Sequence, residues 1–238
     1  MKRRGLRLSC ILTTHSHFDH AGGNKALLKR VPSISVVYGG KNDKASECTK
    51  EVDEGDTFNI GKFLSVSVMY TPCHTPGHVC YVVKASDCDP SVFTGDALFV
   101  SGCGNFNTGT PAQMASAFQR LGKLPMNTLV WAGHEYTVSN LAYACFVEPE
   151  SKILRAKTEW AKAKIAAKAF TVPSTIQEEH EMNPFMRAVY GVDVLVKHCG
   201  TDNPVRAIKF VREEKSSGSW KITKLNPLPT KCVRASPI

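Results

Sequence analysis

Side chains able to bind a metal ion are concentrated in one short segment near the start of the sequence. The heptapeptide Thr14–His20 reads THSHFDH and contains four of them, His15, His17, Asp19 and His20. Alternate residues of an extended segment point the same way, so His15 and His17 can face one cation. Asp19 and His20 follow after the chain turns and can face a second. Imidazole and carboxylate ligands suit Zn, Fe or Mn.

Further residues of this kind lie at the ends of apolar runs. His74 and His78 lie in PCHTPGH, Asp96 ends FTGD, and His134 lies in WAGHEY. Loops that follow strands are where α/β folds place their chemistry. A carboxylate can give one oxygen to each of two ions, so Asp96 is predicted to bridge them.

These residues predict two adjacent cation sites that share Asp96. The first is completed by His15, His17 and His74, and the second by Asp19, His20 and His134. Asp19 and Asp96 are also the expected catalytic carboxylates. His78 is left over, and we interpret it as a residue that packs beneath the site and supports the ligands.

The elements that must position these residues differ between the two halves of the chain. Short β-branched runs bounded by turn residues indicate strands in the first half, and helical periodicity dominates the second. The expected strands are Leu8–Thr13, Ile34–Tyr38, Leu64–Tyr70, Val79–Lys84, Ser91–Thr94 and Thr128–Trp131. The expected helices are Ala21–Arg30, Pro111–Leu121, Val138–Val147, Glu150–Lys168, one that begins at Ile176 after a loop at Thr171–Thr175, and Pro204–Lys215. We therefore expect an α/β domain over 1–137 and a helical domain over 138–238 with an irregular tail from Ser216.

The composition excludes several classes of protein. Of the 238 residues 42% are hydrophobic and 21% charged, which is typical of globular rather than disordered or fibrous chains. No apolar run is long enough to span a membrane. The nine cysteines are scattered without a C-x-x-C pair, which indicates free thiols in a reducing compartment. The net charge is +9, mostly from the second half, and no basic module typical of nucleic-acid binding is recognisable.

The metal-ligand motifs resemble those of the metallo-β-lactamase superfamily, and the wider sequence is similar to its glyoxalase II family (hydroxyacylglutathione hydrolases). The segments that carry the second likeness are HAGGN, VFTGDALFVSGCG, AGHEYTVSNL, VEPE, TVPST and NPFMR. The resemblance implies an αββα sandwich followed by an all-helical substrate-binding domain. It also implies the seven metal positions above, filled by two divalent ions, with zinc preferred to iron or manganese. The implied reaction is hydrolysis of S-D-lactoylglutathione to glutathione and D-lactate by a metal-bridging hydroxide, in methylglyoxal detoxification.

The resemblance also implies where the substrate lies. The expected contacts are Asn105, Phe106, Asn107, His134, Tyr136, Arg212 and Lys215. Arg212 can bind a carboxylate of glutathione with two hydrogen bonds, and Lys215 adds a point charge. The family usually has a lysine and a tyrosine in the loop over 105–107, and this chain has neither, so the preferred acyl group and thiol stay open.

The family has several tens of residues before the first metal motif, so we expect an N-terminally truncated member that lacks the opening strands. Two alternatives stay open: a mono-iron enzyme similar to persulfide dioxygenases, and a truncated paralogue without catalytic activity. The expected partner is a small glutathione thioester, with no nucleic acid and no membrane. The chain is expected to be a monomer in the cytoplasm, or in mitochondria if a presequence has been lost.

Overall fold

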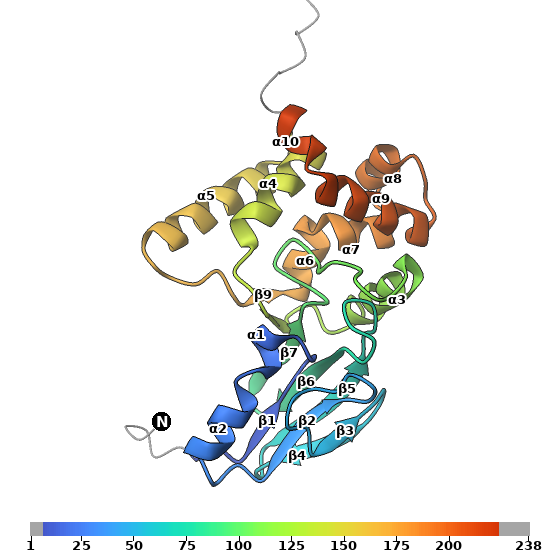
Figure 1. Cartoon of the computed structure of the whole chain (residues 1–238). Helices are drawn as coiled ribbons and strands as arrows, with labels where there is room; N and C mark the ends of the chain where they lie inside the picture. The colour runs from blue at the N-terminus through green and yellow to red at the C-terminus, as the bar shows by residue number, and fades with distance from the viewer. Residues whose placement is uncertain (1–6, 224–238) are drawn as a thin grey trace, which may run out of the picture.

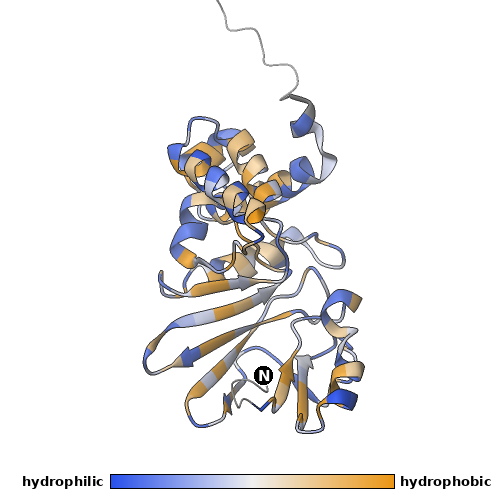
Figure 2. Ribbon diagram, turned by 90° about the vertical axis from the view of Figure 1, so that its left-hand side faces the viewer, coloured by the Kyte–Doolittle hydropathy of each residue, from blue (hydrophilic) through white to orange (hydrophobic). Residues whose placement is uncertain are grey.

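The computed structural model describes residues 7–223, which form two stacked β-sheets with a helical half at one end (Figures 1 and 2). Sheet A is parallel and contains β1 (Cys10–Leu12), β2 (Val36–Gly40) and β3 (Lys50–Val52) in that order. Sheet B follows the chain order β4 to β9. Its strands are β4 (Thr57–Ile60), β5 (Leu64–Tyr70), β6 (Val79–Ala85), β7 (Cys88–Gly95), β8 (Leu129–Ala132) and β9 (Ser174–Thr175).

Helices form the outer layers and the second half of the chain. Helices α1 (Phe18–Ala21) and α2 (Asn24–Arg30) lie beside sheet A, and α3 (Pro111–Leu121) follows the end of β7 (Figure 1). The remaining helices are α4 (Thr137–Val147), α5 (Lys152–Ala166), α6 (Ile176–Met182), α7 (Pro184–Val189), α8 (Asp193–Cys199), α9 (Pro204–Ser217) and α10 (Ser219–Thr223). The expected αββα sandwich followed by a helical region is confirmed. Between residues 7 and 223 no helix has the length and apolar character needed to cross a membrane.

Strand β6 has apolar residues on both faces, so sheet B has an apolar core on each side. Val79 and Tyr81 point into the core between the sheets, where Tyr81 packs with residues such as Val66 of β5. The alternate residues Cys80 and Val82 belong to the core that sheet B shares with the helices. Side chains of a strand alternate between its faces, so a strand covered on both sides reads as a continuous apolar run. All four residues are buried.

Several segments differ from the sequence predictions, which missed β3, β4, α7 and α8. The Thr171–Thr175 loop contains β9, which pairs antiparallel with β8 and ties the helical half to sheet B. The predicted helix Ala21–Arg30 is two helices, α1 and α2, with two glycines between them. The tail that was expected to be irregular from Ser216 is helical to Ser217 and again, after a left-handed Gly218, in α10, where Trp220 is buried against the ring of Tyr143. The rest of that tail, 224–238, lies outside the described residues.

A buried carboxylate joins the helical half to the loop that follows β7 in the first half. Glu179 of α6 accepts hydrogen bonds from the Ser101 backbone N–H (2.9 Å), the Asn183 side chain (2.9 Å) and the Ser174 hydroxyl (2.6 Å). It is 1% exposed and has no cationic partner in the described residues. Burial raises the pKa of Glu179 to about 7, although the three hydrogen bonds oppose that change.

Glu179 therefore predicts a pH-dependent contribution to stability. Its pKa is higher in the folded chain than the ordinary 4.5, so its contribution is present at low pH and is lost as the pH rises through about 7. Between pH 5 and 7.5 the free energy of unfolding of the unsubstituted protein should fall by about 2 kcal/mol more than that of Glu179→Gln. Denaturant unfolding at several pH values measures the difference. Equal pH slopes for the two proteins would show that Glu179 is not buried as described.

Candidate metal centre and active site

The predicted ligands lie in loops at one edge of the sandwich. β1 ends at Leu12 shortly before His15 and His17, and β5 ends shortly before the loop that carries His74. β7 ends at Gly95, directly before Asp96, and β8 ends two residues before His134. Parallel pairing of β7 with β8 brings the ends of those two strands together. Residues up to 119 positions apart in sequence therefore converge on one place.

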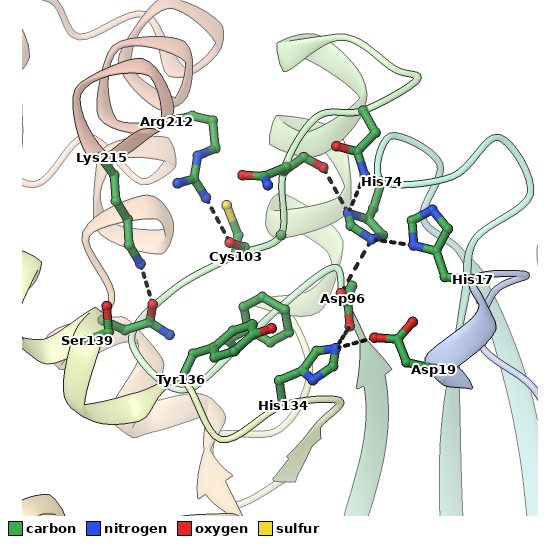
Figure 3. A pocket seen from close by; sticks show the side chains of 15 residues that line it. His17, Asp19, His74, Asp96, Cys103, His134, Tyr136, Ser139, Arg212 and Lys215 are labelled. Atoms are coloured by element: carbon green, nitrogen blue, oxygen red, sulfur yellow. Dashed lines mark hydrogen bonds and ion pairs between the residues drawn. The ribbon is translucent and has the colours of Figure 1, made fainter. Parts of the chain in front are cut away.

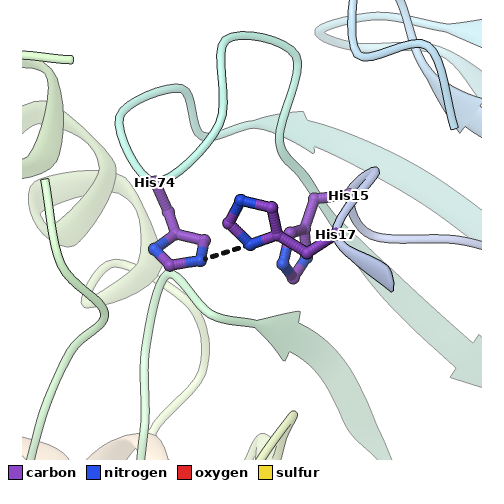
Figure 4. Close-up of side chains that lie close together, drawn as sticks. All are labelled: His15, His17 and His74. Carbon is purple, nitrogen blue, oxygen red and sulfur yellow. Dashed lines mark hydrogen bonds between the residues drawn. The ribbon is translucent and has the colours of Figure 1, made fainter. Parts of the chain in front are cut away.

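The first group of ligands contains three imidazole rings (Figure 4). His74 Nε2 lies 3.1 Å from His17 Nδ1, and candidate ligand atoms of His15, His17 and His74 all lie within 4.8 Å of one another. His74 Nδ1 donates to the Asn105 carbonyl at 3.0 Å, which leaves the lone pair on Nε2, where it faces the group. The Nε2 atom of His15 is buried without a hydrogen-bond partner. This set of lone pairs suits a cation.

The second group contains one carboxylate and two imidazole rings. His20 Nε2 lies 3.1 Å from His134 Nε2, and His134 Nε2 lies 3.3 Å from Asp19 Oδ2. The candidate ligand atoms of the three residues again lie within 4.8 Å of one another. Asp19 is the most exposed of the three, so this group opens toward solvent.

Asp96 lies between the two groups. Its Oδ2 atom is 3.3 Å from His74 Nε2 of the first group. Its Oδ1 atom is 3.2 Å from His20 Nε2 and 3.5 Å from His134 Nε2 of the second. One oxygen therefore faces each group, which is the arrangement a shared carboxylate needs.

The charge states of His15, His74 and Asp96 are compatible with metal binding. Burial, with help from the neighbouring imidazoles, lowers the pKa of His15 to about 2, and burial also lowers the pKa of His74. Both rings are therefore neutral at pH 7, as a metal ligand must be. Burial alone would raise the pKa of Asp96, but the surrounding imidazoles lower it, so the carboxylate stays ionised. The seven residues therefore fit a pair of divalent cations.

Two neighbouring features hold the ligands in place. His78 is fully buried, and its Nδ1 lies 2.8 Å from the Thr71 hydroxyl while its Nε2 accepts the Asp96 backbone N–H at 3.2 Å. Both of its ring nitrogens are occupied, in agreement with the interpretation of His78 as a supporting residue. At Gly133 a Cβ atom would lie 2.8 Å from Asp96 Oδ1, so only glycine lets the loop before His134 approach the carboxylate.

A cavity of about 400 Å³ opens beside both groups. Figure 3 shows Arg212 and Lys215 reaching in from α9, on the wall opposite His17 and His74. Arg212 donates to the Cys103 carbonyl at 2.9 Å, and Lys215 Nζ donates to the side-chain oxygen of Asn140. These hydrogen bonds fix the two positively charged side chains on one side of the cavity.

The other predicted substrate contacts are only partly in this cavity. Tyr136 stacks on the His134 ring with centroids 4.8 Å apart and is half exposed. Asn105 and Asn107 line the cavity, whereas Phe106 does not. Phe106 packs against the apolar core instead.

The structure adds lining residues that the sequence interpretation missed. Ser139 and Asn140, in the first turn and a half of α4, line the cavity together with Phe99 and Cys103. For Ser139 and Asn140 a signal was available, because they lie three and four positions after Tyr136 and share its face of a helix. Phe99 lies in the segment VFTGDALFVSGCG, but nothing there marks it as a cavity residue; it meets Tyr136 edge to face across the fold.

The geometry predicts the metal content of variants. Asp96→Ala removes the carboxylate that faces both groups, so bound metal should fall from about two ions per chain to less than one. His180→Gln is the control, because His180 hydrogen bonds to the Gly122 carbonyl outside the site and should keep both ions. Elemental analysis of the purified proteins after dialysis measures the stoichiometry. Full occupancy in Asp96→Ala would contradict a shared carboxylate.

Comparisons with known proteins agree with this geometry. Residues 2–134 match the model of the metallo-beta-lactamase superfamily, and residues 135–218 match that of the hydroxyacylglutathione hydrolase C-terminus. The chain is 44% identical to a cytoplasmic hydroxyacylglutathione hydrolase of Arabidopsis thaliana over 217 residues. This alignment covers 90% of this chain and 82% of the relative. It is 43% identical over 220 residues to a probable hydroxyacylglutathione hydrolase of Schistosoma mansoni, covering 90% of each.

A solved structure shows the same fold. The crystal structure of ETHE1 from Myxococcus xanthus superposes with a TM-score of 0.56 at 26% identity, over 91% of this chain and 80% of that chain. The identity to the hydrolases is much higher and extends through the helical half. The chain therefore belongs to the glyoxalase II (hydroxyacylglutathione hydrolase) family of the metallo-β-lactamase superfamily and is a thioester hydrolase of that family.

Proposed function

We propose that the enzyme hydrolyses S-D-lactoylglutathione to glutathione and D-lactate with two divalent ions held by the seven residues of the two ligand groups and Asp96. The observation that carries the proposal is the position of Asp96, with one oxygen toward each group at 3.2–3.5 Å. A complete second group, Asp19 with His20 and His134, also favours two ions over the single iron of a dioxygenase. We propose zinc, although the same donors accept iron or manganese.

The reaction needs a nucleophile that the side chains do not supply. When bound, a pair of divalent ions lowers the pKa of water from 15.7 to about 7 and acts as a Lewis acid, so hydroxide is available at neutral pH. Cys73 adjoins His74, but burial raises the pKa of its thiol to about 12, and its Sγ faces the Thr110 carbonyl. A protonated, buried thiol is a poor nucleophile.

The protein residues position the two reactants. Asp19, which is half exposed beside His134, can accept a hydrogen bond from the attacking water and so orient it. Tyr136 lies at the mouth of the same cavity, where its ring covers His134. The thiolate leaves without strong acid assistance, because a free thiol has a pKa near 8.5.

The cations of α9 position the thiol half of the substrate. Glutathione carries two carboxylates, and Arg212 and Lys215 present two positive charges to one cavity. Asn140 and the Cys103 carbonyl hold these side chains, so little side-chain entropy is lost when a carboxylate binds. We further propose that the boundary between the catalytic and the substrate-binding domain lies near residue 138, and that the enzyme acts in the cytoplasm.

The direct test is hydrolysis of S-D-lactoylglutathione by the metal-loaded protein. We expect Arg212→Ala with Lys215→Ala to raise KM about tenfold or more with little change in kcat, because the two cations bind the part of the substrate that does not react. Lys197→Ala with Arg206→Ala is a control with the same change in charge outside the cavity. An unchanged KM in the first variant would remove α9 from the substrate site.

Lys215 predicts a pH dependence of substrate binding. Burial, with repulsion from Arg212, lowers the pKa of Lys215 to about 8, so its positive charge is lost as the pH rises through that value. KM for the anionic thioester should therefore rise about severalfold between pH 7 and 9. Lys215→Arg keeps its charge over this range and should show a flatter profile. Steady-state kinetics corrected for spontaneous hydrolysis measure both, and identical profiles would contradict the role of Lys215.

A further inference from the structure

A second cavity, of about 480 Å³, adjoins the cavity beside the candidate metal ligands (the metal cavity) at the 105–107 loop. The two cavities share Asn105, Asn107 and Arg212 in their walls. We call the second one the outer pocket; Phe106, Lys209 and Glu213 line it and do not line the metal cavity. A ligand bound to Arg212 can therefore extend past the loop into the outer pocket.

The charges of the outer pocket have both signs. Lys209 and Glu213 lie one helical turn apart on α9, with Lys209 Nζ 3.8 Å from a Glu213 carboxylate oxygen. Both side chains are more than half exposed, so each can turn from this weak pair toward a ligand. An ammonium would be favoured beside Glu213 and a carboxylate beside Lys209. An ammonium and a carboxylate on the same carbon form a free α-amino-acid end, which a peptide has only where its first residue is linked through the side chain, as the γ-linked glutamate of glutathione is.

The spacing along α9 matches a ligand of tripeptide size. Lys215 lines the metal cavity, Arg212 lines both cavities, and Lys209 lines only the outer pocket. Six residues of helix separate Lys215 from Lys209, a rise of about 9 Å. A tripeptide spans at most about 10 Å. One ligand can therefore place a carboxylate on Lys215 and Arg212 and a second carboxylate on Lys209.

We propose that the outer pocket is a second subsite, which binds the zwitterionic amino-acid end of the thiol carried by the substrate. Lys209 binds the carboxylate of that end and Glu213 its ammonium, while Arg212 and Lys215 hold the opposite carboxylate. This inference rests on the proposed function, because it assigns the thiol of that thioester to glutathione or a molecule with the same charged end. Lys209 and Glu213 thus become residues that determine specificity.

The test is calorimetric binding of three thiols to the full metal-loaded chain: glutathione, its analogue without the amino group, and N-acetylcysteinylglycine, which lacks the whole amino-acid end. Glu213→Lys should weaken glutathione about tenfold, since it repels the ammonium, and should not weaken the analogue without the amino group. Lys209→Met should weaken glutathione and that analogue about threefold and leave N-acetylcysteinylglycine unchanged. Arg206→Met is the matched control on α9 and should change none of them.

Two results would overturn the subsite. One is equal affinity of the unsubstituted protein for glutathione and N-acetylcysteinylglycine; the other is that neither variant separates the three thiols. Binding needs no turnover, so the outcome is distinguishable from failure of the proposed function. If the thiols bind in the expected order but S-D-lactoylglutathione is not hydrolysed, only the function is wrong. If the thioester is hydrolysed and the thiols bind alike, only the subsite is wrong.

Discussion

Ring nitrogens of four histidines and oxygens of two aspartates crowd together at 3.1–3.7 Å, and a ring nitrogen of His15 lies within 4.8 Å of those of His17 and His74. Such a cluster is costly to bury, because neutral imidazoles repel through their lone pairs and the carboxylate of Asp96 loses water. Most of the candidate ligands nevertheless have little exposure. Divalent cations would turn this repulsion into attraction, so the cost of assembling the residues is recovered when ions bind. The fold therefore has to bring these groups together before any chemistry is possible.

The ends of four strands and two neighbouring residues bring these groups together. The candidate ligands follow β1, β5, β7 and β8, and His78 and Gly133 then set the position of Asp96. The helical half is tied to the same region through β9 and through the buried Glu179. Its helix α9 can therefore present Arg212 and Lys215 at a defined distance from the ligands. In the proposed function, specificity and chemistry are thus supplied by separate layers that share one cavity.

The sequence predicted the parts of this arrangement that depend on local pattern. The bounds of β5 and α3 were predicted to the residue, since alternation and a Thr-Pro helix start are local signals. Strand β9 was missed because two residues carry no periodicity and pair only through tertiary contact. The seven candidate ligands, which the structure brings together, were recognisable from residue type near strand ends. Cys103 and the outer pocket were not, because they depend on how α9 packs against the loop after β7, and Phe99 was not, because it meets Tyr136 only through the fold.

The most direct measurement for the central claim is a crystal structure of the metal-loaded protein with anomalous scattering collected at the edge of the bound metal. We expect two anomalous peaks, one beside each oxygen of Asp96, with His15, His17 and His74 around the first and Asp19, His20 and His134 around the second. A single peak, or two peaks of which one does not contact Asp96, would contradict a carboxylate shared between two ions.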